Sequence, residues 1–237
     1  MKILALETSA KSVSAAVAED GVILASTFQN TGLTHSRTLM PLVDAMLKNG
    51  GLELRQMDLI AVAAGPGSFT GLRIGVSAAK GLAWTLDLPC CAVSTLEAMA
   101  QSVRHMEAEV ICAMDARRSQ IYNAVFAARS EQLERLTPDR AIGLPELAEE
   151  LQNDDQLKII VGDGAAPCCA YLSESGIHCR MAPPALRMQN AVGVAQTASE
   201  MAARGETVPA RDLVPNYLRL SQAERERLAR GLKITAD

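Results

Sequence analysis

The order of predicted secondary structure along this chain restricts its fold to a small number of architectures. Three strands that pair antiparallel come first, and helices then alternate with strands, which gives the order β-β-β-α-β-α-β-α. The predicted elements are strands 2–7, 12–19 and 22–28, helix 34–49, strand 58–64, helix 70–87, strand 90–93 and helix 94–104. Because such an order places helices on a mixed sheet, the first half is predicted to be an α/β lobe.

The second half of the chain begins to repeat this order, although no clear sequence repeat accompanies it. Its predicted elements are strands 109–115, 120–127 and 131–137, helix 144–152, strand 157–162, helix 165–174, strand 178–181 and helix 190–204. We therefore predict two tandem α/β lobes, each a mixed sheet with flanking helices, over residues 1–105 and 106–237. A charged terminal helix is predicted after Pro215.

Composition narrows the functional classes. Half of the residues are hydrophobic and only 3% are aromatic, which predicts an interior of small side chains with closely approaching backbones. The net charge of −4 provides no global attraction to nucleic acid or to a membrane. No apolar stretch approaches the roughly 18–20 residues that span a bilayer, and the six cysteines contain no C-x-x-C pair. These features predict a cytoplasmic protein with reduced, mostly buried thiols and no membrane partner.

A glycine-rich segment, AAGPGSFTGLRIG at residues 63–75, has the composition of a phosphate-binding loop. In the dinucleotide pattern G-x-G-x-x-G, counting from Gly65 and Gly67 places Thr70 where the third glycine belongs. In the P-loop pattern a lysine precedes serine or threonine, whereas the nearby cation here, Arg73, has neither after it. Both spacings are wrong by a residue, so the segment is predicted not to hold a phosphate.

Small residues repeat every four positions along predicted helix 70–87, at Gly71, Gly75, Ala79 and Ala83. This spacing lines one helix face, and each interior glycine costs a helix roughly 1 kcal/mol relative to alanine. The row therefore predicts the close approach of another helix. That helix belongs either to a partner or to the chain itself, at 34–49.

Five blocks carry a family resemblance. They are ILALETSAKSVSAAV, THSRTLMPLVDAML, VAAGPGSFTGLRIGVSAAKGLAW, MDARRSQIYNAVF and PNYLR. Together with the two-lobe element order, they resemble the TsaB family, also called YeaZ, within the superfamily of actin, Hsp70 and sugar kinases. The resemblance is dense up to residue 126 and thin from 128 to 210.

The resemblance implies a role in making threonylcarbamoyladenosine next to the anticodon of tRNAs that read codons beginning with A. It implies a non-catalytic subunit that stabilises and activates a TsaD-like catalytic partner, alongside a TsaE-like ATPase. This chain would associate with tRNA only indirectly, through the complex. A second interpretation is an independent ATP-dependent small-molecule kinase of the same superfamily.

In the TsaB family, two helices pair with the same helices of the TsaD-like partner, and the same surface forms homodimers. The resemblance implies such an interface at Leu39, Val43, Met46, Gly71, Gly75, Ala79 and Ala83. The alternative is internal packing of these residues.

The resemblance also bears on metal binding. TsaD-like proteins hold a metal with the histidine pair of an H-x-x-x-H motif, and Thr95 and Met99 stand at the matching positions here. A hydroxyl and a thioether do not hold zinc or iron firmly. The histidines present, His35, His105 and His178, lack ligand spacing, so we predict no metal site.

Nucleotide phosphates in this superfamily sit between two β-turns. The first turn here reads Glu7-Thr8-Ser9-Ala10 and lacks the usual glycine, so Thr8 and Ser9 are candidates only for weak nucleotide binding. Gly162 and Gly164 stand at the second turn. For both turns the alternative is an ordinary structural turn. ATP is therefore predicted to bind weakly, and no cofactor is required.

The remaining polar candidates have structural interpretations beside the functional ones. Glu7 and Asp115 are not accompanied by a nucleophile or histidine, so no catalytic residue is predicted. Arg117 and Arg118 after Asp115 are suited to an anion or to an exposed hairpin turn. Ser68 before the predicted helix 70–87 is a helix N-cap candidate.

Overall fold

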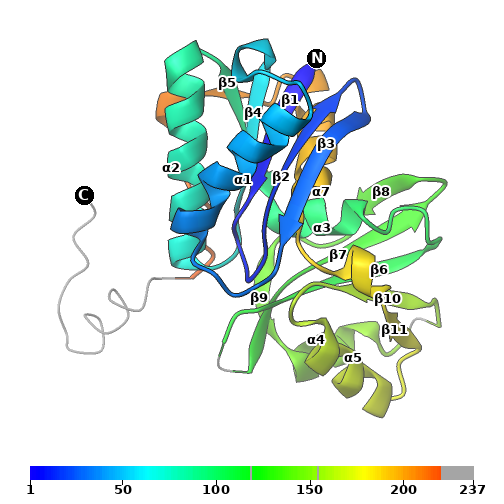
Figure 1. The fold of residues 1–237 in the computed structure, drawn as a ribbon. Coiled ribbons are helices and arrows are strands. Elements are labelled where there is room, and N and C mark those ends of the chain that lie inside the picture. The colour runs from blue at the N-terminus through cyan, green and yellow to red at the C-terminus, as the bar shows by residue number, and fades with distance from the viewer. Residues whose placement is uncertain (118, 154, 220–237) are drawn as a thin grey trace.

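Two sheets, one from each half of the chain, form the framework of the molecule (Figure 1). The structure is a computed structural model that describes residues 1–117, 119–153 and 155–219. Arg118 and most of the charged helix predicted after Pro215 lie outside the described residues.

The first sheet is mixed and has six strands. Their order is β12 (Val208–Pro209), β5 (Pro89–Ser94), β4 (Leu59–Gly65), β1 (Lys2–Glu7), β2 (Val13–Glu19) and β3 (Val22–Gln29). Strand β1 pairs antiparallel with β2 and parallel with β4. The predicted opening of three antiparallel strands in a mixed sheet is confirmed.

The second sheet repeats this pattern. Its order is β11 (Cys179–Met181), β10 (Lys158–Val161), β6 (Ala108–Asp115), β7 (Gln120–Arg129) and β8 (Gln132–Arg135), with β9 (Arg140–Gly143) also on β7. Strand β6 pairs antiparallel with β7 and parallel with β10. Two short strands, β8 and β9, occupy the place of the third strand, and β9 was not predicted.

Helices cover both faces of each sheet. They are α1 (His35–Asn49), α2 (Phe69–Leu86), α3 (Thr95–Gln101), α4 (Leu144–Leu151), α5 (Ala165–Glu174), α6 (Pro184–Arg187) and α7 (Ala191–Ala203), with 3-10 turns η1 (Leu54–Gln56) and η2 (Ala210–Asp212). Helices α1 and α2 cover the outer face of the first sheet, α4 and α5 that of the second, and α3 and α7 lie between the sheets (Figure 1). None of the helices in the described residues is long and apolar enough to cross a membrane.

Alternation along the buried strands explains this layering. In β1, Leu4 and Leu6 face the core beneath α1 and α2, whereas Ile3 and Ala5 face the core beneath α7. A strand that is apolar on both faces requires helices on both sides. The short apolar runs of the sequence therefore specify a sheet enclosed between helical layers.

The assignment of the chain's last elements to the second lobe is corrected by the structure. Helix α7 packs on the first sheet, and β12 pairs with β5 at that sheet's edge. Helix α7 also crosses α3 closely at Gly193, where a Cβ would lie 2.0 Å from the Ala98 carbonyl oxygen. Only glycine allows this close approach. The division near residue 105 separates β1–β5 from β6–β11, but the first lobe is completed by residues from beyond position 190.

Candidate functional site

The glycine-rich segment wraps around the turn at residues 7–10. A Cβ on Gly67 would lie 2.5 Å from the Ser9 carbonyl oxygen, and a Cβ on Gly71 would lie 2.1 Å from that of Thr8. At Gly75 the same atom would lie 2.3 Å from the Thr8 hydroxyl oxygen. These distances are too short for any side chain, so the glycines exist to let α2 and its loop approach the first turn.

The seven residues that were predicted to contact a partner lie inside the first lobe. They are Leu39, Val43, Met46, Gly71, Gly75, Ala79 and Ala83, and all are buried. The close neighbour of the glycine row is the turn at 7–10 and the sheet below it, not another helix. Their prediction as partner contacts is therefore corrected to internal packing, because enclosed side chains have no surface to offer.

Two hydrogen-bond donors of the first turn, the Thr8 hydroxyl and the Ser9 amide, are used within the chain. The Thr8 hydroxyl donates to the Gly71 carbonyl oxygen at 2.8 Å, and the Ser9 amide donates to the Glu7 carboxylate. The Ser68 amide at the start of α2 donates to the Ser9 carbonyl oxygen at 2.7 Å. The Ser68 hydroxyl also accepts from the Gly71 amide at 3.4 Å, which confirms its role as N-cap. The Thr8 hydroxyl and the Ser9 amide thus hold the turn itself.

The amides of Gly162 and Gly164 in the second turn are also hydrogen-bonded within the chain. Gly162 has φ of +110°, and its amide donates to the Arg187 carbonyl oxygen at 2.7 Å. The Gly164 amide donates to the Ala113 carbonyl oxygen at 3.0 Å. A Cβ on Gly162 would lie 2.1 Å from that same oxygen. The two glycines therefore form a tight strand-to-helix turn, the structural alternative recognised from the sequence.

Carboxylates from both turns face the space between them. Glu7 is fully buried, and burial raises its pKa to about 7, with the negative charge of Asp163 adding to the rise and hydrogen bonds from Ser9 opposing it. Gln189 links the two sides, because its side-chain amide donates to Asp163 at 3.0 Å and its backbone carbonyl oxygen accepts from the Ser12 hydroxyl at 2.9 Å. Sequence reasoning missed Gln189 and Ser12, which carry no motif.

These contacts predict weak nucleotide binding. A phosphate between the turns would have to displace internal hydrogen bonds and lie near Asp163, whose charge opposes an anion. Calorimetric titration of the purified chain with ATP and magnesium is expected to give no submicromolar affinity. A submicromolar dissociation constant, abolished by Gly162→Val, would contradict this expectation and revive the kinase interpretation.

Residues 214–219, here called the strap, cover the glycine-rich loop. The Asn216 amide donates to the Ala64 carbonyl oxygen at 2.7 Å, and the Tyr217 ring stacks on Phe69 with centroids 3.9 Å apart. Arg73 donates to the Tyr217 hydroxyl at 3.0 Å. Arg219 then reaches the Ala116 carbonyl oxygen of the β6–β7 turn at 2.5 Å. The PNYLR block thus connects the loop of the first lobe to a turn of the second.

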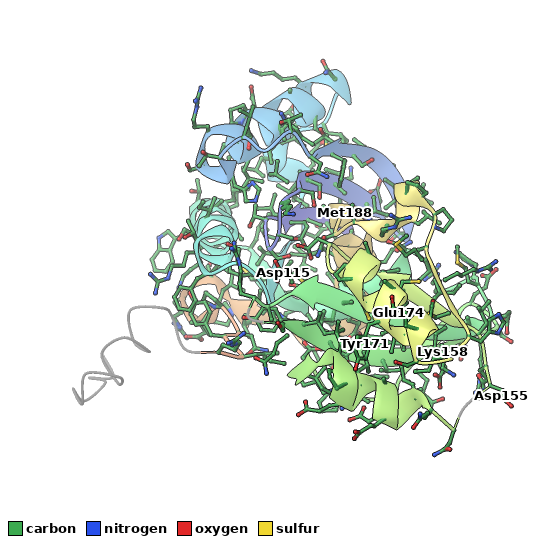
Figure 2. The ribbon with its side chains drawn as sticks, turned by 90° about the horizontal axis from the view of Figure 1, so that it is seen from below. Asp115, Asp155, Lys158, Tyr171, Glu174 and Met188 are labelled. Atoms are coloured by element: carbon green, nitrogen blue, oxygen red, sulfur yellow. The ribbon has the colours of Figure 1, made fainter. Side chains whose placement is uncertain are left out.

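The remaining candidates occupy structural positions. Thr95 and Met99 are buried in α3, and no group of three or more His, Cys, Asp and Glu side chains in the described residues is arranged to share a metal ion. Asp115 accepts from the Arg117 amide at 2.7 Å at the start of the β6–β7 turn (Figure 2). Asp115 therefore has an internal role, because it accepts a hydrogen bond from a backbone amide of its own turn.

Fold and site together define the class of protein. Two α/β lobes meet at two turns, where the Thr8 hydroxyl and the Ser9, Gly162 and Gly164 amides are bonded to the chain itself. A family model described as "TsaD: tRNA N6-adenosine threonylcarbamoyltransferase" matches residues 28–226. The chain belongs to the TsaB family, also called YeaZ, which is related to TsaD.

Individual relatives match along nearly the whole chain. The protein TsaB of Bacillus subtilis, named for tRNA threonylcarbamoyladenosine biosynthesis, is 34% identical, covering 94% of this chain and 96% of its own length. The protein of the same name from Escherichia coli is 32% identical over 92% of this chain and 95% of its own. The solved structure of YeaZ from Pseudomonas aeruginosa is 28% identical, with a TM-score of 0.78, and covers 92% of this chain and 99% of that one.

Proposed function

We propose that this chain is a non-catalytic cytoplasmic subunit that stabilises and activates a TsaD-like catalytic partner. With a TsaE-like ATPase, the pair transfers a threonylcarbamoyl group to the adenosine next to the anticodon of tRNAs that read codons beginning with A. Membership of the TsaB family supports the pathway. The observation that carries the subunit role is the internal use of the Thr8 hydroxyl and of the amides at Ser9, Gly162 and Gly164. These donors hold the protein's own turns, which suits them to maintaining a fold rather than to binding reactants.

The outer surfaces of α1 and α2 are the proposed docking face for this partner. On α2 the exposed positions Ser77 and Gly81 are small and lie one turn apart, and a Cβ on Gly81 would meet no atom within 4 Å. Met40 on α1 and Trp84 on α2 are exposed apolar residues of the same two helices. Small residues on an outer face allow close helix packing against a partner. The docking prediction for this helix pair is thus kept, but with outward-facing residues.

Replacement Gly81→Arg is expected to weaken assembly with the TsaD-like partner without unfolding the chain. The new side chain enters open space, so the melting temperature is expected to stay within a few degrees of the wild type, because arginine is a better helix former than glycine. A large cation in a close helix contact is expected to reduce affinity by about tenfold or more. Titration of the two purified proteins by calorimetry measures the change.

Glu149→Arg is the matched control, since it also places an arginine on an exposed helical position, on α4 of the second lobe. It is expected to bind the partner like the wild type. Equal affinity of Gly81→Arg and the control would place the docking face elsewhere. Loss of self-association in Gly81→Arg alone would support the use of the same face in homodimers.

The function itself is tested by reconstitution. The TsaD-like partner, the TsaE-like ATPase and a substrate tRNA are assayed for transfer with and without this chain, supplied with the activated threonylcarbamoyl donor. Transfer is expected only when the partner and this chain are both present. Transfer by the partner at full rate without this chain would refute the activating role, and phosphorylation of small molecules by this chain alone would favour the kinase.

A further inference from the structure

Two cysteines face each other at the edge of the second sheet. Cys169 lies in α5, Cys179 begins β11, and their sulfur atoms are 3.8 Å apart. The Cys179 sulfur also lies 3.4 Å from the Ser173 hydroxyl oxygen. Both cysteines are half-buried and neither is bridged, so dissolved reagents reach a preformed pair of thiols.

The backbone between the two cysteines holds them at this distance. The Ile177 amide donates to the Leu172 carbonyl oxygen at 2.9 Å, and the His178 carbonyl oxygen accepts from the Lys158 amide at 3.0 Å. These bonds fix the turn to α5 on one side and to β10 on the other. A disulfide needs its sulfur atoms about 2.05 Å apart, so the gap closes by less than about 2 Å, which rotation about the side-chain bonds provides.

We propose that Cys169 and Cys179 form a thiol–disulfide exchange site that reacts with low-molecular-weight disulfides and closes into a reversible Cys169–Cys179 bond. The site lies in the second lobe, and the proposal is independent of the docking face and of the transferase partner.

The exchange balances with the dissolved disulfide as oxidant. The thiolate of one cysteine attacks a sulfur of the reagent, forming a mixed disulfide and releasing one reagent thiolate. The second cysteine loses its proton and attacks the protein sulfur of that mixed disulfide, which expels the other reagent thiolate. Two protein thiols lose two electrons, the reagent disulfide gains them, and the two protons end on the released thiols.

The other four cysteines do not compete for this role. Burial raises the pKa of Cys90 and Cys91 to about 11 and that of Cys168 to about 12, and it raises the pKa of Cys112 well above its ordinary value. Because the thiolate is the reactive form, these thiols are inert at neutral pH. Burial also raises the pKa of Cys179, whereas the Ser173 hydroxyl opposes that rise.

The bond would tie an edge strand to a helix. Strand β11 has three residues and pairs within the sheet only with β10 in the described residues. Cross-linking it to α5 restricts the unfolded chain and removes fraying of that edge. We expect the oxidised protein to melt about 5 °C above the reduced protein.

Mass spectrometry tests the pairing directly. The reduced full-length chain is incubated with oxidised glutathione at about pH 8, the remaining thiols are blocked with a maleimide, and the protein is digested with a protease that cleaves after glutamate. Cleavage after Glu174 places Cys168 and Cys169 on one peptide and Cys179 on another. The expected product is these two peptides joined by a disulfide, formed without urea and reversed by dithiothreitol.

Two serine variants identify the partner of Cys179. Cys168→Ser is the matched control, because it changes the adjacent buried cysteine and is expected to keep the linkage. Cys169→Ser is expected to abolish the linkage, to leave glutathione on Cys179, and to lose the rise in melting temperature. Circular dichroism confirms that both variants are folded. Linkage that persists in Cys169→Ser, glutathione adducts without linkage in the wild type, or reaction only in urea would each overturn the proposal.

Discussion

Gly75→Leu is expected to destabilise the first lobe severely. A Cβ at this position would lie 2.3 Å from the Thr8 hydroxyl oxygen and 3.3 Å from a methyl carbon of Val62, and the rest of the leucine side chain extends further into the same space. The Thr8 hydrogen bond to Gly71 would also be disturbed. Overpacking costs typically 1–3 kcal/mol and occasionally more, and loss of the Thr8 hydrogen bond adds about 1 kcal/mol. After the roughly 1 kcal/mol gained in helix propensity, a cost at the upper end leaves a net loss of about 3 kcal/mol. The melting temperature should fall by about 10 °C.

Gly81→Leu is the control for this effect, because it adds the same side chain to the same helix where no atom lies within 4 Å. Its melting temperature should match or slightly exceed that of the wild type. Thermal unfolding followed by circular dichroism compares the two variants. A folded Gly75→Leu protein with a wild-type melting temperature would mean that the glycine row does not face the turn at residues 7–10.

Glu7→Gln is expected to remove a large part of the pH dependence of stability. In the folded chain burial raises the pKa of Glu7 from 4.5 to about 7, so the folded state keeps a proton that the unfolded state releases between these values. Proton release favours the unfolded state as the pH rises, so the contribution of Glu7 to stability falls between about pH 4.5 and 7 and is lost above. A shift of this size corresponds to about 3 kcal/mol. Glutamine, which is neutral and of the same shape, lacks this decline.

Urea unfolding of both proteins from about pH 5 to 8 measures this difference. The variant should match the wild type at the acidic end and exceed it in free energy of unfolding at the alkaline end. Glu149→Gln, on the exposed surface of α4, should give the wild-type profile. Parallel profiles for Glu7→Gln and the wild type would show that the buried carboxyl is not held in its protonated form.

Local patterns predicted most of the fold because most elements are defined by their own periodicity. The helix expected at 165–174 begins and ends there in the structure, and strand 109–115 differs by one residue at its start. The resemblance of the second half to the first was visible in element order alone. The missed strand, β9 (Arg140–Gly143), has four residues and little alternation, so it depends on β7 for its pairing.

The site was predicted less well because its contacts join residues that are far apart in the sequence. The four-residue spacing of Gly71 and Gly75 identifies a shared helix face, but spacing does not reveal what that face meets. The effect of Asp163 on Glu7 depends on how the two lobes meet, which no local pattern reveals. Helix α7 has a periodicity that fits either lobe, and its place on the first sheet follows from the close crossing at Gly193.

That placement of α7 governs the timing of folding during translation. One face of the first sheet, including Ile3, Ala5 and Ala61, is covered by residues 191–198. These residues leave the ribosome only after every strand from β6 to β11 has emerged. Proteins with several domains generally fold the N-terminal one first as it is synthesised, but here the first sheet waits with an uncovered apolar face for the end of the chain. The first lobe can therefore complete its folding only after the second sheet has been synthesised, and until then the uncovered face of its sheet is a hydrophobic surface that a chaperone can bind.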